Sequence, residues 1–336
     1  MESLGDREAV DLTILDPFRQ GWALGRRNFG PEIYFFAPAI KHYETEEYSN
    51  QGPPRFVPIS ITGQTCALQC DHCQGRILRG MAPAASPDKL LATAATLAQR
   101  GTQGILVSGG SQADGMVPLK GFLPALQEIK ERYRLQIIVH LGLVDEALAA
   151  GLAEARVDAA MLDVIGCDQT IREVYHLEAT PVDYAASLRW LTTYGVETVP
   201  HVVIGLHYGR IAGEREALRI ISQFPVASLV LVGLLPLYDT PMEGITPPSP
   251  EEMGELFLQA RLLFPHTPVL LGCERPAGEH KGQTDLYALK AGLNGIAYPA
   301  EGIVGAAQDL GLQPIFSPWC CSLIFQMKRD EEIIAK

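Results

Sequence analysis

The chain has 336 residues, 47% of them hydrophobic and 20% charged, with a formal net charge of −12 at pH 7. Its length suits one large α/β domain, and its acidic balance argues against a nucleic-acid partner, which calls for a basic face. No run approaches the ~18 apolar residues that a membrane span needs, and the N-terminus carries no basic-then-apolar signal. We therefore expect a cytoplasmic protein with no membrane partner, and seven cysteines suit that reducing compartment.

Apolar, strand-like runs alternate with helical patterns through most of the chain. We expect strands near residues 56–62, 104–108, 135–140, 158–164, 197–204, 227–232, 268–271 and 294–298. Eight strands alternating with helices predict a complete (β/α)8 TIM-type barrel, in the α/β class. The predicted parts are an N-terminal cap segment (1–50), the barrel (51–318) and a C-terminal tail (319–336).

Helix boundaries and one discordant residue refine this outline. Ser86 and Ser249, each followed by proline and an acidic residue, predict the starts of two helices. Pro58 lies inside the first predicted strand, where a central strand would lose a hydrogen bond of the sheet. A bulge or a partly open barrel edge would accommodate it.

Three cysteines follow the first predicted strand in the pattern C-x3-C-x2-C: Cys66, Cys70 and Cys73. Thiolates at this spacing wrap one face of a [4Fe–4S] cube and leave one iron without a protein ligand. Zinc is the alternative, but structural zinc calls for four ligands from paired motifs. A disulfide framework fits poorly with an odd number of cysteines and no secretory segment. The loop therefore predicts an iron–sulfur cluster with one open iron.

This loop, directly after an apolar strand, resembles the signature of radical S-adenosylmethionine (SAM) enzymes. The resemblance implies that the amine and carboxylate of SAM chelate the open iron. It also implies one-electron reduction by a donor such as ferredoxin or flavodoxin, which splits the sulfonium and gives a 5′-deoxyadenosyl radical. In that family the residue before the third cysteine, here His72, lies against the adenine of SAM.

The loops after the strands of a parallel barrel form its active face, so polar and glycine residues there are candidates for ligand contact. Ser108, Gly109 and Gly110 follow the second predicted strand. Paired glycines let backbone groups approach a ligand closely, although any α/β turn can use them. By position they resemble the family's glycine-rich motif, which holds the ammonium group of SAM.

Further candidates follow the fourth and fifth predicted strands. Asp163, Asp168 and Arg172 resemble by position the ribose-binding strand of the family and the arginine that binds the carboxylate of SAM. In the alternative reading, Asp168 only caps a helix and Arg172 is solvated. Gly205 lies in a segment that resembles the adenine-contact strand.

Two histidines lie on predicted strands, His140 at the end of the third and His201 within the fifth. Both are expected to point into or toward the barrel, where histidine can act as an acid or a base on a substrate. The alternative is that both are hydrogen-bonded core residues.

The C-terminal half resembles the biotin synthase group of radical SAM enzymes, through residues 235–242, 271–276 and 291–299. Residues 165–175 and the segment around Cys273 look most similar to two-component lipoyl synthases. That resemblance implies sulfur insertion into an octanoyl chain on a lysine of a carrier protein or peptide, with a second radical SAM subunit. The alternatives are a biotin synthase-like or hydrogenase-cofactor-maturation enzyme acting on a small molecule, and a non-catalytic electron carrier.

Four cysteines remain outside the motif. Our hypothesis is a second, auxiliary cluster held by Cys273, Cys320 and Cys321, which would serve as the sulfur donor. Free cysteines are also small buried hydrophobes, and adjacent cysteines seldom fit one cluster without strain. We expect Cys167 to be such a small filler.

Overall fold

All strands in the described part of the chain belong to one parallel sheet. The structure, a computed structural model, describes residues 12–14, 16–38 and 40–327. Within this part of the chain, eleven strands follow one another across the sheet in the order β11-β1-β10-β9-β8-β7-β6-β5-β4-β2-β3. The strands are β1 (Glu32–Phe36), β2 (Phe56–Ser60), β3 (Ala82–Pro83), β4 (Gly104–Ser108), β5 (Gln136–Leu141), β6 (Ala159–Asp163), β7 (Thr198–Ile204), β8 (Leu229–Gly233), β9 (Val269–Leu271), β10 (Gly295–Ala297) and β11 (Gln313–Ser317).

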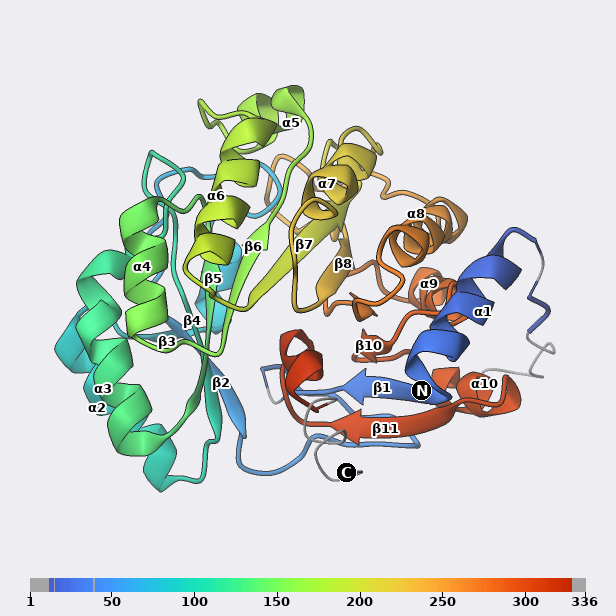
Figure 1. The fold of residues 1–336 in the computed structure, drawn as a ribbon, viewed down its shortest axis with the longest axis horizontal. Coiled ribbons are helices and arrows are strands. Elements are labelled where there is room, and N and C mark those ends of the chain that lie inside the picture. Colours follow the sequence, from blue (N-terminus) through green and yellow to red (C-terminus); the bar gives the residue numbers. More distant parts are fainter. Residues whose placement is uncertain (1–11, 15, 39, 328–336) are drawn as a thin grey trace.

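Helices cover the outer, convex face of this curved sheet (Figure 1). The α-helices are α1 (Phe18–Phe29), α2 (Pro87–Gln99), α3 (Leu123–Tyr133), α4 (Glu146–Glu154), α5 (Asp168–Val174), α6 (Pro181–Thr193), α7 (Glu214–Ile221), α8 (Pro250–Leu263), α9 (Glu279–Lys290) and α10 (Ile303–Asp309). Short 3-10 helices are η1 (Arg76–Gly80), η2 (Leu119–Phe122) and η3 (Cys321–Leu323). None of the described helices is both long enough and apolar enough to cross a membrane.

The strands expected from the sequence are confirmed, since all eight are present as β2 and β4 to β10. The two helix starts are confirmed as well. Ser86 caps α2 by accepting a hydrogen bond from the Lys89 backbone, and Ser249 forms a capping box with Glu252 at the start of α8. The α/β class is therefore confirmed, and the helices alternate with the strands as expected.

The expectation of a complete, closed (β/α)8 barrel needs correction. Among the described residues the sheet is a half-barrel whose two ends, β3 and β11, do not pair with each other. Pro58 lies next to this open end of the sheet. The Ile61 amide donates to Ser108 of β4, whereas the Ser60 carbonyl faces β3 and accepts from Ala84. Pro58 has the same orientation as Ser60, so the amide that it lacks faces the short, open side of the sheet.

Two segments expected outside the sheet are integrated with it. In the predicted cap, β1 lies between β10 and β11 as a full member of the sheet. In the predicted tail, η3 contacts β6 and β10, and Figure 1 shows this red turn in the space between β2 and β1. Parts of both segments, residues 1–11 and 328–336, lie outside the described residues, and the boundaries 1–50, 51–318 and 319–336 remain predictions.

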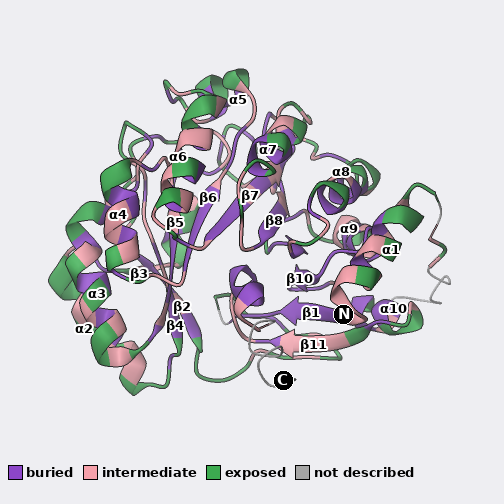
Figure 2. Cartoon of the chain, in the orientation of Figure 1, coloured by how far each residue is buried: buried purple, intermediate pink, exposed green. Residues whose placement is uncertain are grey.

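Two apolar cores result from the alternation of side chains along the strands. The outer core packs the sheet against the helices, and Figure 2 shows each helix buried on its sheet side and exposed on the other. The inner core fills the concave side and includes residues of the C-terminal segment: Tyr34, Phe36, Phe56, Ile138, Met161, Val199, Val230, Leu270, Cys321, Leu323, Ile324 and Phe325. Ser108, His140, Asp163 and His201 have the inward orientation on their strands, toward the carboxyl ends.

Candidate functional site

The three motif cysteines line one cavity at the carboxyl ends of the strands. Its wall also contains Gly109 and Gly110 after β4, together with residues after β5, β6 and α5. Cys70 and Cys73 are buried and Cys66 is half-buried. Among the described residues no three Cys, His, Asp or Glu side chains are arranged to hold a single metal ion. A [4Fe–4S] cluster, in which each thiolate binds its own iron, is the group that the sequence predicts for this loop.

Burial disfavours the thiolate form of two of these cysteines, Cys70 and Cys73. Burial raises the pKa of Cys70 well above its ordinary value, and the neighbouring thiols Cys73 and Cys66 add to this rise. Burial also raises the pKa of Cys73 to about 11. A thiol binds metal as the thiolate, so metal binding at this loop must displace protons.

Close packing of the glycine-rich loop against the cysteine loop explains why Gly110 is glycine. The Gly110 amide donates to Thr62 Oγ1 at 2.7 Å, and the Ala67 amide donates to the Ser111 carbonyl at 2.8 Å. A Cβ atom at Gly110 would lie 2.1 Å from the Thr65 carbonyl oxygen. Backbone approach this close tolerates no side chain. The two loops therefore form one rigid wall of the cavity.

His72 and Tyr175 provide polar atoms without protein partners at the cavity. Their rings lie 5.2 Å apart between centroids, and both residues line the cavity. His72 Nδ1 and the Tyr175 hydroxyl are buried and have no hydrogen-bond partner. Burial lowers the pKa of His72, so its imidazole is neutral near pH 7. Buried polar groups are normally satisfied, and unpaired ones at a cavity are expected where a ligand supplies the partner.

His140, Asp163 and His201 form a polar layer on the concave side of the sheet. His140 Nε2 lies 3.5 Å from Asp163 Oδ1, and the rings of His140 and His201 lie 5.3 Å apart. Burial works to lower the pKa of His140, but the hydrogen bond and charge of Asp163 outweigh it and the pKa is raised. Burial and the charge of His140 lower the pKa of His201 to about 4. The pKa values of the two histidines are thus shifted in opposite directions, which favours His140 as a proton donor and His201 as a neutral acceptor.

The same interactions act on Asp163. Burial alone would raise the pKa of its carboxyl group, but the hydrogen bond from His140 and the charges nearby lower it. Ser108 Oγ donates to the His140 carbonyl at 2.9 Å and joins this layer to β4. His140 and Asp163 both line the cavity of the cysteines, whereas His201 lies just outside its lining.

Three of the predicted SAM contacts lie away from this cavity. Asp168 and Arg172 are exposed on α5. Gly205 has a left-handed backbone with φ +83°, and a Cβ atom there would lie 2.3 Å from Pro248. Their predicted contacts with SAM, like the other assigned roles of site residues, stay predictions.

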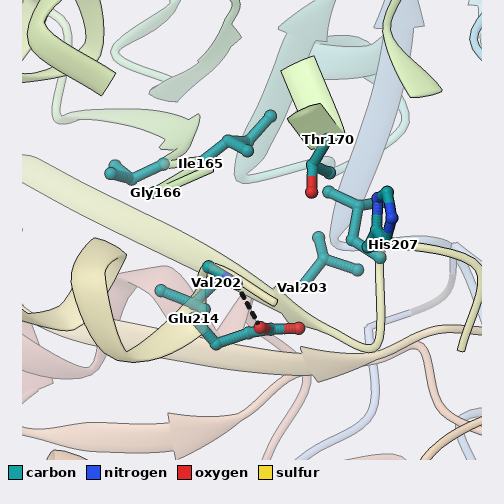
Figure 3. Close-up of a pocket in the computed structure, with 10 residues that line it drawn as sticks. Ile165, Gly166, Thr170, Val202, Val203, His207 and Glu214 are labelled. Atoms are coloured by element: carbon teal, nitrogen blue, oxygen red, sulfur yellow. Dashed lines mark hydrogen bonds between the residues drawn. The ribbon is translucent and has the colours of Figure 1, made fainter. Parts of the chain in front are cut away.

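A smaller pocket lies between the segments after β6 and β7 (Figure 3). Its Glu214 carboxylate accepts hydrogen bonds from the amides of Gly205, Ala212 and Gly213 at 2.7 to 2.9 Å, which fixes the loop after β7. Thr170 Oγ1 and His207 Nδ1 line the same pocket and have no hydrogen-bond partner.

The second group of cysteines lies on the other side of the half-barrel. Cys273 follows β9 and is exposed, Cys320 is half-buried after β11, and Cys321 is buried. A hydrogen bond with the Cys321 thiol lowers the pKa of Cys320 to about 7 and raises that of Cys321. The charge of His140 also lowers the pKa of Cys320, so this thiol lies near the polar layer on the concave side.

Sequence reasoning missed several residues of this arrangement. Arg275 and Asp285 form a fully buried ion pair, with Arg275 Nη1 also donating to the carbonyls of Gly272 and Ala297. Asp71, inside the cysteine motif, bonds to segments far away in the sequence. The signals available were a charged residue in the loop after β9, for Arg275, and an acidic residue between two cysteines, for Asp71. Neither identifies its partner.

Comparison with known proteins agrees with this geometry. The fold is a parallel α/β half-barrel, and the loop after β2 carries the three motif cysteines. Residues 60–221, just under half of the chain, match the model of the radical SAM superfamily and form a radical SAM domain. The expected recognition is thereby confirmed. The family implies a [4Fe–4S] cluster and SAM.

Particular relatives are more distant. A biotin synthase of Syntrophotalea carbinolica (strain DSM 2380 / NBRC 103641 / GraBd1) is 26% identical over 261 residues, 75% of this chain and 77% of the relative. A crystal structure of methylornithine synthase matches with a TM-score of 0.61 and 17% identity over 89% of this chain and 88% of the other. The hydrogenase maturase HydG matches with a TM-score of 0.62 and 13% identity over 95% of this chain and 72% of the other. At these identities the two solved structures show the fold alone.

The residues at the cavity fit the cofactors that the family implies. Cys66, Cys70 and Cys73 supply three thiolate ligands, and the glycine-rich loop leaves room for close approach beside them. The unpartnered polar atoms of His72 and Tyr175 are available to a polar ligand at the same cavity.

Proposed function

We propose that this radical SAM enzyme inserts sulfur into an octanoyl chain on a lysine of a carrier protein or peptide. The observation that carries the proposal is a second group of cysteines, Cys273, Cys320 and Cys321, on the opposite side of the concave face from the motif cysteines. Sulfur insertion replaces a C–H bond by a C–S bond and so needs a sulfur source near the radical. A second subunit of the same superfamily and a reductant such as ferredoxin or flavodoxin complete the proposal.

The motif cysteines would hold the first cluster, and His72 and Gly110 border the space beside it. When bound, the cluster and SAM supply a 5′-deoxyadenosyl radical on one-electron reduction. A primary carbon radical must be kept from water and from side reactions. In this proposal the apolar part of the cavity beside the motif cysteines, with Val117, Leu141 and Leu143 in its lining, would provide that environment for an alkyl chain.

The polar layer would handle protons around the new sulfur. His140, whose pKa is raised in its pairing with Asp163, is the proton donor. His201 is neutral and donates from Nδ1 to the Val199 carbonyl at 3.0 Å, which leaves Nε2 as a hydrogen-bond acceptor. These roles derive from environments that push the two pKa values apart.

The C-terminal segment would hold the sulfur source. The Ser322 hydroxyl lies 2.8 Å from Met161 Sδ and fastens this segment to β6. Lys41 Nζ donates to the Cys273 carbonyl at 3.2 Å and lies 4.5 Å from the Tyr298 ring centroid. Cys273 and Cys320 thus belong to segments anchored to the sheet.

A direct test is mass spectrometry of an octanoyl-lysyl carrier peptide after anaerobic incubation with SAM and a reductant. The proposal expects a mass gain from sulfur, with 5′-deoxyadenosine formed, and about eight irons per chain after reconstitution. Incubation without reductant is the control. Formation of 5′-deoxyadenosine with no thiolated peptide, alone and with the second subunit, would contradict the proposal.

A second candidate is a biotin synthase-like or hydrogenase-cofactor-maturation enzyme that acts on a small molecule. The identity of 26% to a biotin synthase over three quarters of the chain favours it. In that case we expect no reaction on the carrier peptide. About four irons per chain would favour this candidate over sulfur insertion from a second cluster.

A further inference from the structure

Asp71 lies between Cys70 and Cys73, and its side chain bonds to two segments outside the cysteine loop. Its Oδ1 lies 2.8 Å from Nε2 of His176, which lies between α5 and α6. Its Oδ2 accepts a hydrogen bond of 2.7 Å from the hydroxyl of Tyr208, in the loop after β7. One carboxylate therefore joins three loops at the carboxyl ends of β2, β6 and β7.

Backbone bonds reinforce this junction. The Asp71 amide donates to the Val174 carbonyl at 2.9 Å, and the Tyr208 hydroxyl lies 3.3 Å from the Glu173 carbonyl. The cysteine loop is thus attached to the last turn of α5 through both the backbone and the side chain of Asp71.

The two partners of Asp71 adopt backbone conformations that need support. His176 has φ +54° and Tyr208 has φ +50°, in the left-handed region that non-glycine residues rarely occupy. Such conformations persist where surrounding contacts determine them. The Asp71 side chain is 16% exposed and its partner His176 is 46% exposed. The Asp71–Tyr208 bond is therefore the more enclosed of the two.

The joined segments are those on which the sequence predicts SAM contacts, since α5 carries Asp168 and Arg172 and the loop after β7 begins at Gly205. We propose that Asp71 is a positioning residue that, through Tyr208 and His176, holds the cysteine loop in register with the segments after β6 and β7, on which the sequence predicts SAM contacts. The proposal depends on the cluster and SAM that the family implies, and it is independent of the substrate.

Tyr208→Phe tests this proposal, because it removes only the hydroxyl that bonds to Asp71. Tyr194→Phe is the matched control, since the Tyr194 hydroxyl bonds to Glu146 at 2.9 Å on the outer helices. We expect Tyr208→Phe to assemble the cluster with wild-type iron content and apoprotein melting temperature close to that of the control. Its SAM dissociation constant should rise about tenfold, the scale of one hydrogen bond to a charged group. The change that SAM causes in the electron paramagnetic resonance spectrum of the reduced cluster should weaken accordingly.

Three results would overturn the proposal. The first is a SAM dissociation constant within twofold of wild type in Tyr208→Phe. The second is failure of Tyr208→Phe to assemble the cluster, because the Tyr208–Asp71 bond would then be needed for cluster assembly and not for the position of the cysteine loop relative to SAM. The third comes from His176→Ala, which removes the more exposed partner and is expected to weaken SAM binding by a smaller factor. SAM affinity unchanged in His176→Ala would show that the junction does not act through both partners. All these readouts are independent of sulfur insertion.

Discussion

The two cysteine groups differ in how the chain assembles them. Cys66, Cys70 and Cys73 lie within eight residues of one loop, next to a glycine-rich loop that packs against it. Cys273 and Cys320 come from separate loops, and Lys41, which bonds to the Cys273 carbonyl, is 232 residues away from it. Local spacing defines the first group, and only the folded sheet brings the second together. When the cysteines lie in one loop, their spacing in the sequence indicates both the ligands and the group that they bind. When they lie in separate loops, the sequence identifies candidate cysteines but does not show how they are arranged.

The largest expected effect comes from breaking the local group. Replacing Cys66, Cys70 or Cys73 by alanine should remove the reducible cluster and all SAM cleavage, because each thiolate holds a separate iron. Iron content, the visible spectrum and chromatography of 5′-deoxyadenosine measure this. If any one variant still forms 5′-deoxyadenosine, the assignment of this loop is wrong.

Breaking the dispersed group should separate radical formation from sulfur transfer. Cys273→Ala and the double change of Cys320 and Cys321 to alanine should keep the first cluster and still form 5′-deoxyadenosine. They should fail to thiolate an octanoyl-lysyl peptide and should contain about half the wild-type iron. Cys167→Ala, which removes the remaining cysteine, is the control and should behave as wild type. Normal thiolated product in both test variants would show that the sulfur comes from elsewhere.

The buried pair Arg275–Asp285 supports the dispersed group. Arg275 Nε lies 2.5 Å from Asp285 Oδ1, and the two side chains are 1% and 0% exposed. Arg275→Ala leaves a buried carboxylate without its partner and should destabilise the apoprotein by about 3–5 kcal/mol. Arg156→Ala removes the exposed pair with Glu131 and should cost at most about 1 kcal/mol. Chemical denaturation of both proteins measures the contrast, and equal losses would mean that burial of the pair has no consequence.

Arg172 tests the predicted SAM contacts on the side of the local group. If its guanidinium binds the carboxylate of SAM, Arg172→Ala should weaken SAM binding by ~1.5–3 kcal/mol and leave the cluster spectrum intact. Equilibrium dialysis measures the affinity, and Arg189→Ala, on an exposed face of α6, is the control. Unchanged affinity would assign Arg172 to the solvated surface on which it lies in the structure.

The sequence predicted the strands and the local group well for a physical reason. Fully buried parallel strands read as apolar runs, and cluster ligands in one loop keep a fixed spacing. The sequence did not predict that the barrel stays open, and it did not predict which side chains pair with one another. Nothing local shows that β1 enters the sheet beside β10, or that the segment with Cys321 fills the concave side. The partners of Asp71 and Arg275 are likewise set by tertiary contacts, since the chain distance from Asp71 to Tyr208 is 137 residues.

The smallest expected effect is the change in apoprotein stability caused by Asp163→Asn, in the polar layer between the two cysteine groups. The folded-state pKa of His140 is raised, so the stabilisation from its pairing is fully present below the unfolded value of about 6.5 and is lost as pH rises through the folded value. The pKa of Asp163 is lowered, so its part is present above about 3.9 and is lost as pH falls through its folded value.

The difference in melting temperature between wild-type and Asp163→Asn apoprotein should therefore be largest between about pH 4 and pH 6.5. It should shrink as the pH rises through the raised pKa of His140, where the imidazole loses its proton. His201, whose pKa is about 4, is neutral across most of this range and contributes little to the difference. A constant difference from pH 4 to pH 9 would mean that His140 and Asp163 do not form a charged pair. The layer would then be a neutral part of the core, with no proton to offer to either cysteine group.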